Sequence, residues 1–460
     1  MKFLNKTFII CITFWLVITL IRLFNHQPWF DEANVWMIAQ KASFGQLFLL
    51  TKIEGHPFVW YMVIMPFAKL NFMYPYSLLI VNWLFCLGAI LTLWKYAPFN
   101  NILKCAISFS FPFFALFPIV ARCYSISIFI LFVLAALFEK KSKHPIIYSI
   151  LILICANTNA MAMIGSFCFG CFLFFDLIKE KQIKNIIITS VTAVLTALIL
   201  FLQYSGLDKT YTDERLTSGL NIGFFSNTFI FPVEINIILL SIFVLGFFIL
   251  LLKSPKAFIF TFICYVYLLA IFEFSYSGNE WHHYFFYIYL IIGVWILLND
   301  NNVTDNIKKG ITCLLVILSA FFIIDYRYRP LVFNSHSYDI AKFIENNEQA
   351  RFILFDGNFL STIPYFDKSK KYDIYHYQTG LNINETAKQI KHSEIISAEK
   401  IHSLMSKNKI NYGISDKYFD VINNDKYSLK FEPVKIYPLG YNYNYYIYKI
   451  YTDFYANIKS

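Results

Sequence analysis

The chain has 460 residues, of which 58% are hydrophobic and only 15% are charged. Such a composition excludes an ordinary soluble protein and predicts a mostly α-helical, polytopic membrane protein. The formal net charge of +10 does not indicate nucleic-acid binding, because the lysines occupy short loops between hydrophobic runs and form no single stripe.

The N-terminus begins with Lys2 and Lys6 and continues into an apolar stretch over 8–24. No small-residue cleavage site follows it, so we expect an uncleaved anchor whose N-terminus lies inside. The nine cysteines fall mostly inside apolar runs, and the tail after Tyr326 has none, so no disulfide framework or zinc-ligand spacing is visible.

The apolar runs predict eleven membrane spans. We expect them at about 8–24, 75–94, 102–121, 123–138, 145–163, 164–178, 185–203, 233–252, 257–274, 284–298 and 310–325. The run from Phe58 to Ala68 contains Pro66 and has the length of an interfacial or re-entrant helix. If it does not cross, most basic loops lie inside, as the positive-inside rule requires, and the C-terminus lies outside.

Residues 25–74 then form the first outer loop, which holds the adjacent carboxylates Asp31 and Glu32. Apolar residues recur at helical spacing from Asp31 to Ala42, and Ser43 is placed to cap a second short helix, so we expect interfacial helices. The sequence Glu54-Gly55-His56-Pro57 predicts a sharp turn that directs side chains back at the carboxylates. The alternative is that Asp31 and Glu32 only favour the dipole of a surface helix.

Further polar residues collect on the same side. Arg122 lies at the outer end of a hairpin, where it could hold a lipid phosphate or simply form an ion pair at a helix end. Glu280, His282 and His283 precede a span; adjacent histidines rarely bind one ion, so phosphate or sugar contact is favoured over metal. The remaining outer features are Asn157, Asn159 and the loop Tyr204–Phe231, a solvated loop or a lid that carries Lys209, Asp213, Glu214 and Arg215.

After residue 325 the composition becomes polar, which predicts a small α/β or α+β domain outside the membrane over 326–460. We expect strands over Arg351–Phe355, Tyr372–Tyr377, Ile410–Ser415, Leu429–Tyr437 and Tyr443–Tyr451, and helices over Ser337–Asn346, Asn384–His392 and Ala398–Lys407. No catalytic motif stands out in this tail.

Three short motifs resemble the GT-C class of membrane glycosyltransferases, and family 39 in particular, the branch of protein O-mannosyltransferases and lipid A aminoarabinose transferases. They are Phe30-Asp31-Glu32-Ala33, Glu54-Gly55-His56-Pro57 and Ala121-Arg122-Cys123-Tyr124. The resemblance covers residues 1–325, which we expect to form the transmembrane catalytic domain. The order of the motifs carries it more than any one of them.

The resemblance implies transfer of a sugar from a polyprenyl phosphate donor to a hydroxyl on the outer face of the plasma membrane, with inversion. Asp31 matches the general base of that family. We expect Arg122, assisted by His56 or His282, to bind the phosphate and Glu32 or Glu54 to orient the donor or the acceptor. Tyr124 and His283 are further expected substrate-binding residues. No metal or cofactor is implied. The C-terminal tail differs from that of the mannosyltransferases, so a glycan or a lipid is as good a candidate for the acceptor as a protein.

Two other functional classes remain open. An O-antigen polymerase or ligase also acts on polyprenyl-linked glycans, but relies on arginine and histidine in a late outer loop. A polyprenyl-glycan transporter would show ionisable residues within spans and repeated halves, and neither is clear here. A non-catalytic scaffold is the third alternative.

Overall fold

The computed structural model describes residues 6–48, 56–205, 241, 244–275, 278–324, 335–347, 349–355, 358–366, 370–377, 397–423, 428–440 and 443–453. It is mostly helical, with a small sheet near the C-terminus. The chain divides into two compact units. The helical unit comprises Met1–Phe24 and Ile38–Leu331, and the mixed unit comprises Asn25–Met37 and Val332–Ser460.

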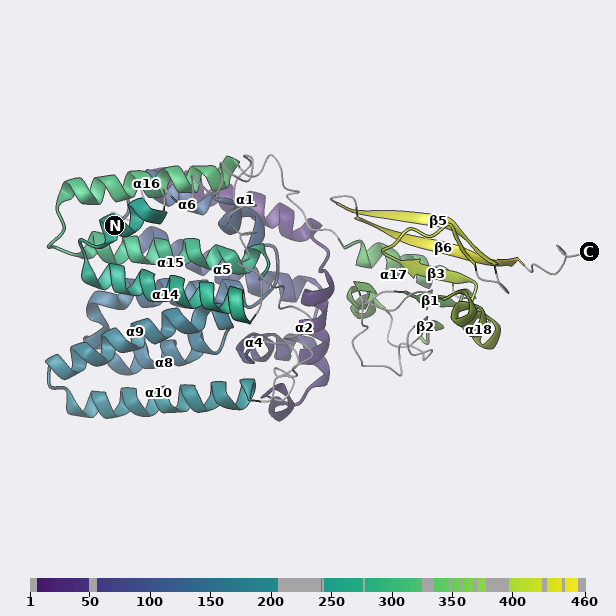
Figure 1. Cartoon of the computed structure of the whole chain (residues 1–460), viewed down its shortest axis with the longest axis horizontal. Helices are drawn as coiled ribbons and strands as arrows, with labels where there is room; N and C mark the ends of the chain where they lie inside the picture. Colours follow the sequence, from purple (N-terminus) through teal and green to yellow (C-terminus); the bar gives the residue numbers. More distant parts are fainter. Residues whose placement is uncertain are drawn as a thin grey trace, which may run out of the picture. The chain divides into compact units, whose positions relative to one another are not determined.

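The helical unit is a bundle in which α8, α9 and α10 lie side by side and α14 packs on α15 (Figure 1). Its long helices are α1 (Lys6–Asn25), α5 (Tyr76–Tyr96), α9 (Ala160–Lys179), α10 (Ile183–Tyr204), α14 (Pro255–Phe274), α15 (Glu280–Asn299) and α16 (Asp305–Ile324). The shorter ones are α2 (Phe30–Lys41), which continues from the mixed unit, α4 (Val59–Lys69), α6 (Asn101–Ser108), α7 (Tyr124–Leu137) and α8 (Pro145–Ala156).

Within the described ranges, seven helices are long and apolar enough to cross a membrane: α1, α5, α9, α10, α14, α15 and α16. Each coincides with an expected span. The expected spans at 123–138 and 145–163 are shorter helices of 14 and 12 residues, α7 and α8. The second ends early because Asn159 caps α9, accepting from the Ala162 backbone N–H at 2.9 Å. The expected span at 233–252 lies largely outside the described residues.

The expectation of one continuous span over 102–121 is wrong. Helix α6 ends at Ser108, a π-helical turn follows over Pro112–Leu116, and α7 begins only at Tyr124. Pro118 supplies no backbone N–H for the Phe114 carbonyl, and the π-helical turn and the break after it leave the carbonyls of Phe113 and Phe117 without helical partners. Side chains take their place. Trp15 Nε1 donates to Phe113 O, Arg22 to Phe114 O, and Asn82 and Ser125 both donate to Phe117 O, at 2.8–3.0 Å.

The expected helices of the first outer loop are present where the chain is described. Helix α2 begins one residue before Asp31, and Ser43 caps the next helix, since its hydroxyl accepts from the Gln46 N–H while Gln46 Oε1 accepts from the Ser43 N–H at 2.8 Å. Helix α4 has only 11 residues and contains Pro66, as expected of a run too short to cross.

The mixed unit contains one six-stranded sheet in the order β2-β1-β3-β6-β5-β4. Strands β2, β1 and β3 are parallel, and β3, β6, β5 and β4 are antiparallel neighbours. The strands are β1 (Phe352–Leu354), β2 (Ile374–His376), β3 (Tyr412–Ser415), β4 (Val421–Asn423), β5 (Ser428–Gly440) and β6 (Tyr443–Asp453). The five expected strands are confirmed, and β4 is additional.

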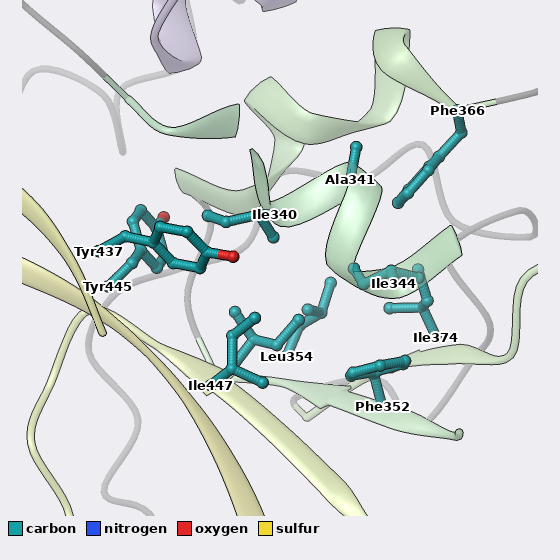
Figure 2. Packing of buried hydrophobic residues seen from close by; sticks show 11 residues of the cluster. Ile340, Ala341, Ile344, Phe352, Leu354, Phe366, Ile374, Tyr437, Tyr445 and Ile447 are labelled. Atoms are coloured by element: carbon teal, nitrogen blue, oxygen red, sulfur yellow. The ribbon is translucent and has the colours of Figure 1, made fainter. Parts of the chain in front are cut away.

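Two helices cover opposite faces of this sheet. Successive side chains of a strand point to opposite faces, and the two helices pack on alternate residues of β1. Helix α17 (Ser337–Glu345) contributes Ile340, Ala341 and Ile344 to a core with Phe352 and Leu354 (Figure 2). Helix α18 (Ala398–Asn408) contributes Ala398 and Ile401 to a second core with Ile353. The helix expected over 384–392 lies outside the described residues.

The unit boundary near residue 331 is close to the expected domain boundary at 325. The first outer loop is divided, however. Its opening segment Asn25–Met37, which carries Asp31 and Glu32, belongs to the mixed unit, whereas the sequence led us to place it in the transmembrane domain. Hydrogen bonds join this segment to the start of α17 and the residues just before it: Gln27 bonds to Tyr338 and Asp339, and the Pro28 carbonyl accepts from Ser335.

Candidate functional site

His56 is held in a turn that is anchored from two other helices. The Phe58 backbone N–H donates to Gln203 Oε1 at 2.9 Å, and the Val59 N–H donates to the Asn157 carbonyl at 3.3 Å. Gln203 also donates to Asn157 Oδ1 at 2.8 Å, so the end of α10, the turn before α9 and the start of α4 are joined. These bonds satisfy the first N–H groups of α4, which has no side-chain cap. They also fix where His56 lies.

Arg122 and Tyr124 are placed by the break after α6. The chain leaves the π-helical turn, bends at Val120, whose carbonyl accepts from the Arg122 N–H at 2.9 Å, and enters α7 at Tyr124. Arg122 is 8% exposed and Tyr124 is 2% exposed. A guanidinium so deeply buried requires negatively charged or hydrogen-bonding groups around it.

His282 is oriented by the cap of α15. Asn279 and His282 form a capping box, in which His282 Nδ1 accepts from the Asn279 backbone N–H at 2.9 Å. The ring therefore carries no proton on Nδ1 and is neutral, with its proton on Nε2. That N–H donates to the Tyr124 hydroxyl oxygen at 2.8 Å, which leaves the hydroxyl's own proton directed at another acceptor.

These residues form one group, which we call the Arg122 cluster: His56, Arg122, Cys123, Tyr124 and His282. The His56 and His282 rings are stacked with centroids 6.5 Å apart, and Tyr124 meets His282 edge-on at 5.4 Å. His56 Nδ1 lies 3.8 Å from Cys123 Sγ, and the charge of Arg122 acts on both imidazoles. Loops expected only to share a side are thus in contact.

Burial, together with the charge of Arg122, lowers the pKa of His56 to about 3. The imidazole is therefore neutral at physiological pH, like that of His282. The cluster combines one buried guanidinium with neutral N–H and O–H groups, a set whose chemistry suits an anion such as a phosphate.

In the mixed unit, Glu32 makes bonds that the sequence did not predict. Both of its carboxylate oxygens contact His26 Nε2, at 2.9 and 3.1 Å, and Oε2 accepts from the Trp29 backbone N–H at 3.1 Å. Glu32 and His26 are fully buried. Glu32 is thereby engaged in bracing the first turn of α2, whereas its neighbour Asp31 is half-buried. Only the spacing of His26 before the two carboxylates signals this pair in the sequence.

The other candidate residues lie elsewhere. The His283 ring packs edge-on against the Phe272 ring, with centroids 4.7 Å apart. Glu54 and the loop with Lys209 and Arg215 are outside the described residues, as is the side chain of Glu280. One residue not assigned to the site from the sequence is Tyr204, at the end of α10, which interacts electrostatically with Cys123. Its buried hydroxyl has no hydrogen-bond partner among the described residues.

No group of three or more His, Cys, Asp or Glu side chains in the described part of the chain is arranged to hold a metal ion. Comparison with known proteins gives no match to any family model, curated protein or solved structure. The class that the fold defines is therefore a coarse one, a helical protein with seven membrane-length helices and a small C-terminal sheet.

Proposed function

We propose that the chain is a membrane glycosyltransferase of the GT-C kind, which moves a sugar from a polyprenyl phosphate donor to a hydroxyl of a cell-envelope glycan, lipid or protein at the outer face of the plasma membrane. The observation that carries the proposal is the Arg122 cluster, a buried guanidinium beside neutral imidazole and phenol donors. A lipid-linked phosphate needs positive charge and hydrogen-bond donors next to an apolar bundle.

In this proposal the Arg122 guanidinium and the Tyr124 hydroxyl contact the donor phosphate. Asp31 takes the proton of the acceptor hydroxyl, whose oxygen attacks the anomeric carbon while the bond from that carbon to the phosphate oxygen breaks. The products are the inverted glycoside and polyprenyl phosphate, whose developing charge Arg122 stabilises. Glu32 braces the turn that carries Asp31.

The test compares the wild type with Asp31→Asn and Arg122→Gln in membranes supplied with radiolabelled polyprenyl phosphate sugars. Loss of the base is expected to lower kcat by roughly 10²- to 10⁴-fold. Loss of the guanidinium is expected to lower it by roughly 10²- to 10³-fold and to weaken inhibition by polyprenyl phosphate. Asp305→Asn, an exposed residue in the first turn of α16, is the matched control and should transfer normally.

Transfer that is unchanged in Asp31→Asn would remove this residue as the base. Transfer that is unchanged in Arg122→Gln would separate the cluster from the phosphate. Either result must be read on protein that is inserted and folded, as judged by its thermal unfolding in detergent.

An enzyme similar to the O-antigen ligases is the second candidate, because the cluster pairs an arginine with two histidines. Both candidates bind a polyprenyl-linked donor, so they differ in the base rather than in the phosphate site. Activity lost in Arg122→Gln but kept in Asp31→Asn would favour this alternative.

A further inference from the structure

The segment before Asp31 is bound to the start of α17 by a set of specific hydrogen bonds. Gln27 uses both ends of its amide: Oε1 accepts from the Tyr338 backbone N–H at 2.9 Å, and Nε2 donates to Asp339 Oδ2 at 3.2 Å. The Ser335 hydroxyl donates to the Pro28 carbonyl at 2.8 Å. Residues more than 300 positions apart therefore share one network, within the mixed unit.

The α17 side of this network is rigidly supported. His336 lies just before the helix in a left-handed conformation with φ of 51°, and its Nδ1 contacts Asp339 Oδ2 at 3.0 Å. Ile340, the residue after Asp339, packs in the core of the sheet (Figure 2). The Tyr437 hydroxyl donates to the Asp339 carbonyl at 3.4 Å, which connects the same turn to β5. Asp339 therefore has contacts within the domain, to His336 and Tyr437, in addition to its bond with Gln27.

The Gln27 side leads directly to the first turn of α2. Pro28 restricts the backbone, Trp29 donates its N–H to Glu32, and Glu32 is held by His26. Asp31 therefore lies between a braced glutamate and a bound glutamine. A carboxylate that acts as a base must be held to a fraction of an ångström, which a segment of this kind achieves only through outside contacts.

We infer that the C-terminal domain positions Asp31, and that the Gln27–Asp339 pair is the contact through which it does so. The catalytic consequence rests on the proposed function, whereas the contact itself does not. Gln27 and Asp339 are positioning residues, since their side chains bind one another and the backbone of α17. The C-terminal domain contains no recognisable catalytic motif, and its role in the proposed reaction is to hold Asp31 in position.

The contact is tested by swapping its polarity in the full-length protein in lipid nanodiscs. Gln27→Glu places a carboxylate against Asp339, and Asp339→Ala removes the oxygen that accepts from Gln27, so each of these single variants disrupts the pair. The double variant Gln27→Glu with Asp339→Asn restores the bond with its direction reversed, because the introduced glutamate accepts from the amide that replaces the Asp339 carboxylate. Backbone amide exchange over residues 29–37 is expected to accelerate about tenfold in each single variant and to return to within about threefold of wild type in the double variant.

Gln46→Glu is the matched control, because a glutamate at that exposed position can still complete its capping box with Ser43. Its exchange over 29–37 should match the wild type. Unchanged exchange in both single variants, or a double variant that exchanges as fast as the singles, would overturn the inference.

The catalytic arm measures transfer in the same variants. A positioning role predicts that kcat falls about tenfold or more in the single variants and recovers in the double variant, while KM for the donor stays within about twofold. A loss of kcat that the double variant does not recover would contradict it. If exchange responds but no protein transfers sugar, the contact stands and the proposed function fails; if transfer occurs with unchanged exchange, only the inference fails.

Discussion

At the scale of single residues, the Arg122 cluster depends on contacts that no sequence pattern contains. Topology predicted that His56, Arg122 and His282 share one side of the bundle, but not that they touch. What brings them together is a capping box with histidine in the place of glutamate, and a turn anchored by Gln203. The capping box is local, but the bonds from Tyr124 to His282 and from Phe58 to Gln203 join positions more than 140 residues apart and depend on helix packing, which a sequence does not show.

The depressed pKa of His56 predicts how stability changes with pH. In the unfolded chain His56 takes up a proton near pH 6.5, whereas in the folded protein it does so only near pH 3. Between these values the unfolded state binds more protons, so the folded protein loses stability as the pH falls from about 6.5 toward 3. The stabilisation is fully present above pH 6.5.

This prediction is checked by thermal unfolding across pH 4 to 8 in wild type and His56→Gln. The Tm of the glutamine variant should fall less steeply on acidification, because this variant lacks the proton, about one per molecule, that His56 takes up on unfolding. His402→Gln, at a half-buried position of α18, is the control for the substitution itself. Identical slopes in all three proteins would show that His56 titrates normally.

At the scale of elements, the sequence predicted ends and types well where a strong period was present. The strands over 429–437 and 443–451 alternate sharply and pair as β5 and β6, whereas the three-residue strand β4 was not predicted. The continuous apolar run over 102–121 conceals a break, since hydrophobicity does not report the π-helical turn that Pro112 and Pro118 permit. Arg122 owes its position to that break.

Packing between α14 and α15 gives an element-scale prediction at Gly293. A methyl group on its Cα would overlap Thr261 Oγ1, so Gly293→Ala forces the two helices apart and should cost about 1–3 kcal/mol of stability. Gly310→Ala in α16 meets no atom within 4 Å and should be neutral or slightly stabilising, because alanine favours a helix over glycine. Unfolding midpoints in the same detergent compare the two variants, and equal Tm values would contradict the tight contact.

At the scale of the whole molecule, the basic loops of the helical unit meet at one end. Lys141 pairs with Asp176 at 2.5 Å, Ser142 donates to Glu180 at 2.8 Å, and Lys256 lies over the Phe138 ring at 5.9 Å. Helix α7 runs from the Arg122 cluster at Tyr124 to this basic end at Leu137. The basic loop and the candidate phosphate site therefore lie at opposite ends of α7. The positive-inside rule predicts this arrangement for a protein whose phosphate site lies on the outer side.

This polarity predicts the topology, with the basic end inside the cell and the C-terminal domain outside. In a background with the nine cysteines replaced, Ser406→Cys on α18 should react with a membrane-impermeant maleimide in intact cells, because that position is exposed. Lys181→Cys, equally exposed in the turn between α9 and α10, should react only after the membrane is permeabilised. Labelling of Lys181→Cys in intact cells would show that the bundle has the opposite orientation. The Arg122 cluster would then lie at the inner face of the membrane, where a donor on the outer face could not reach it.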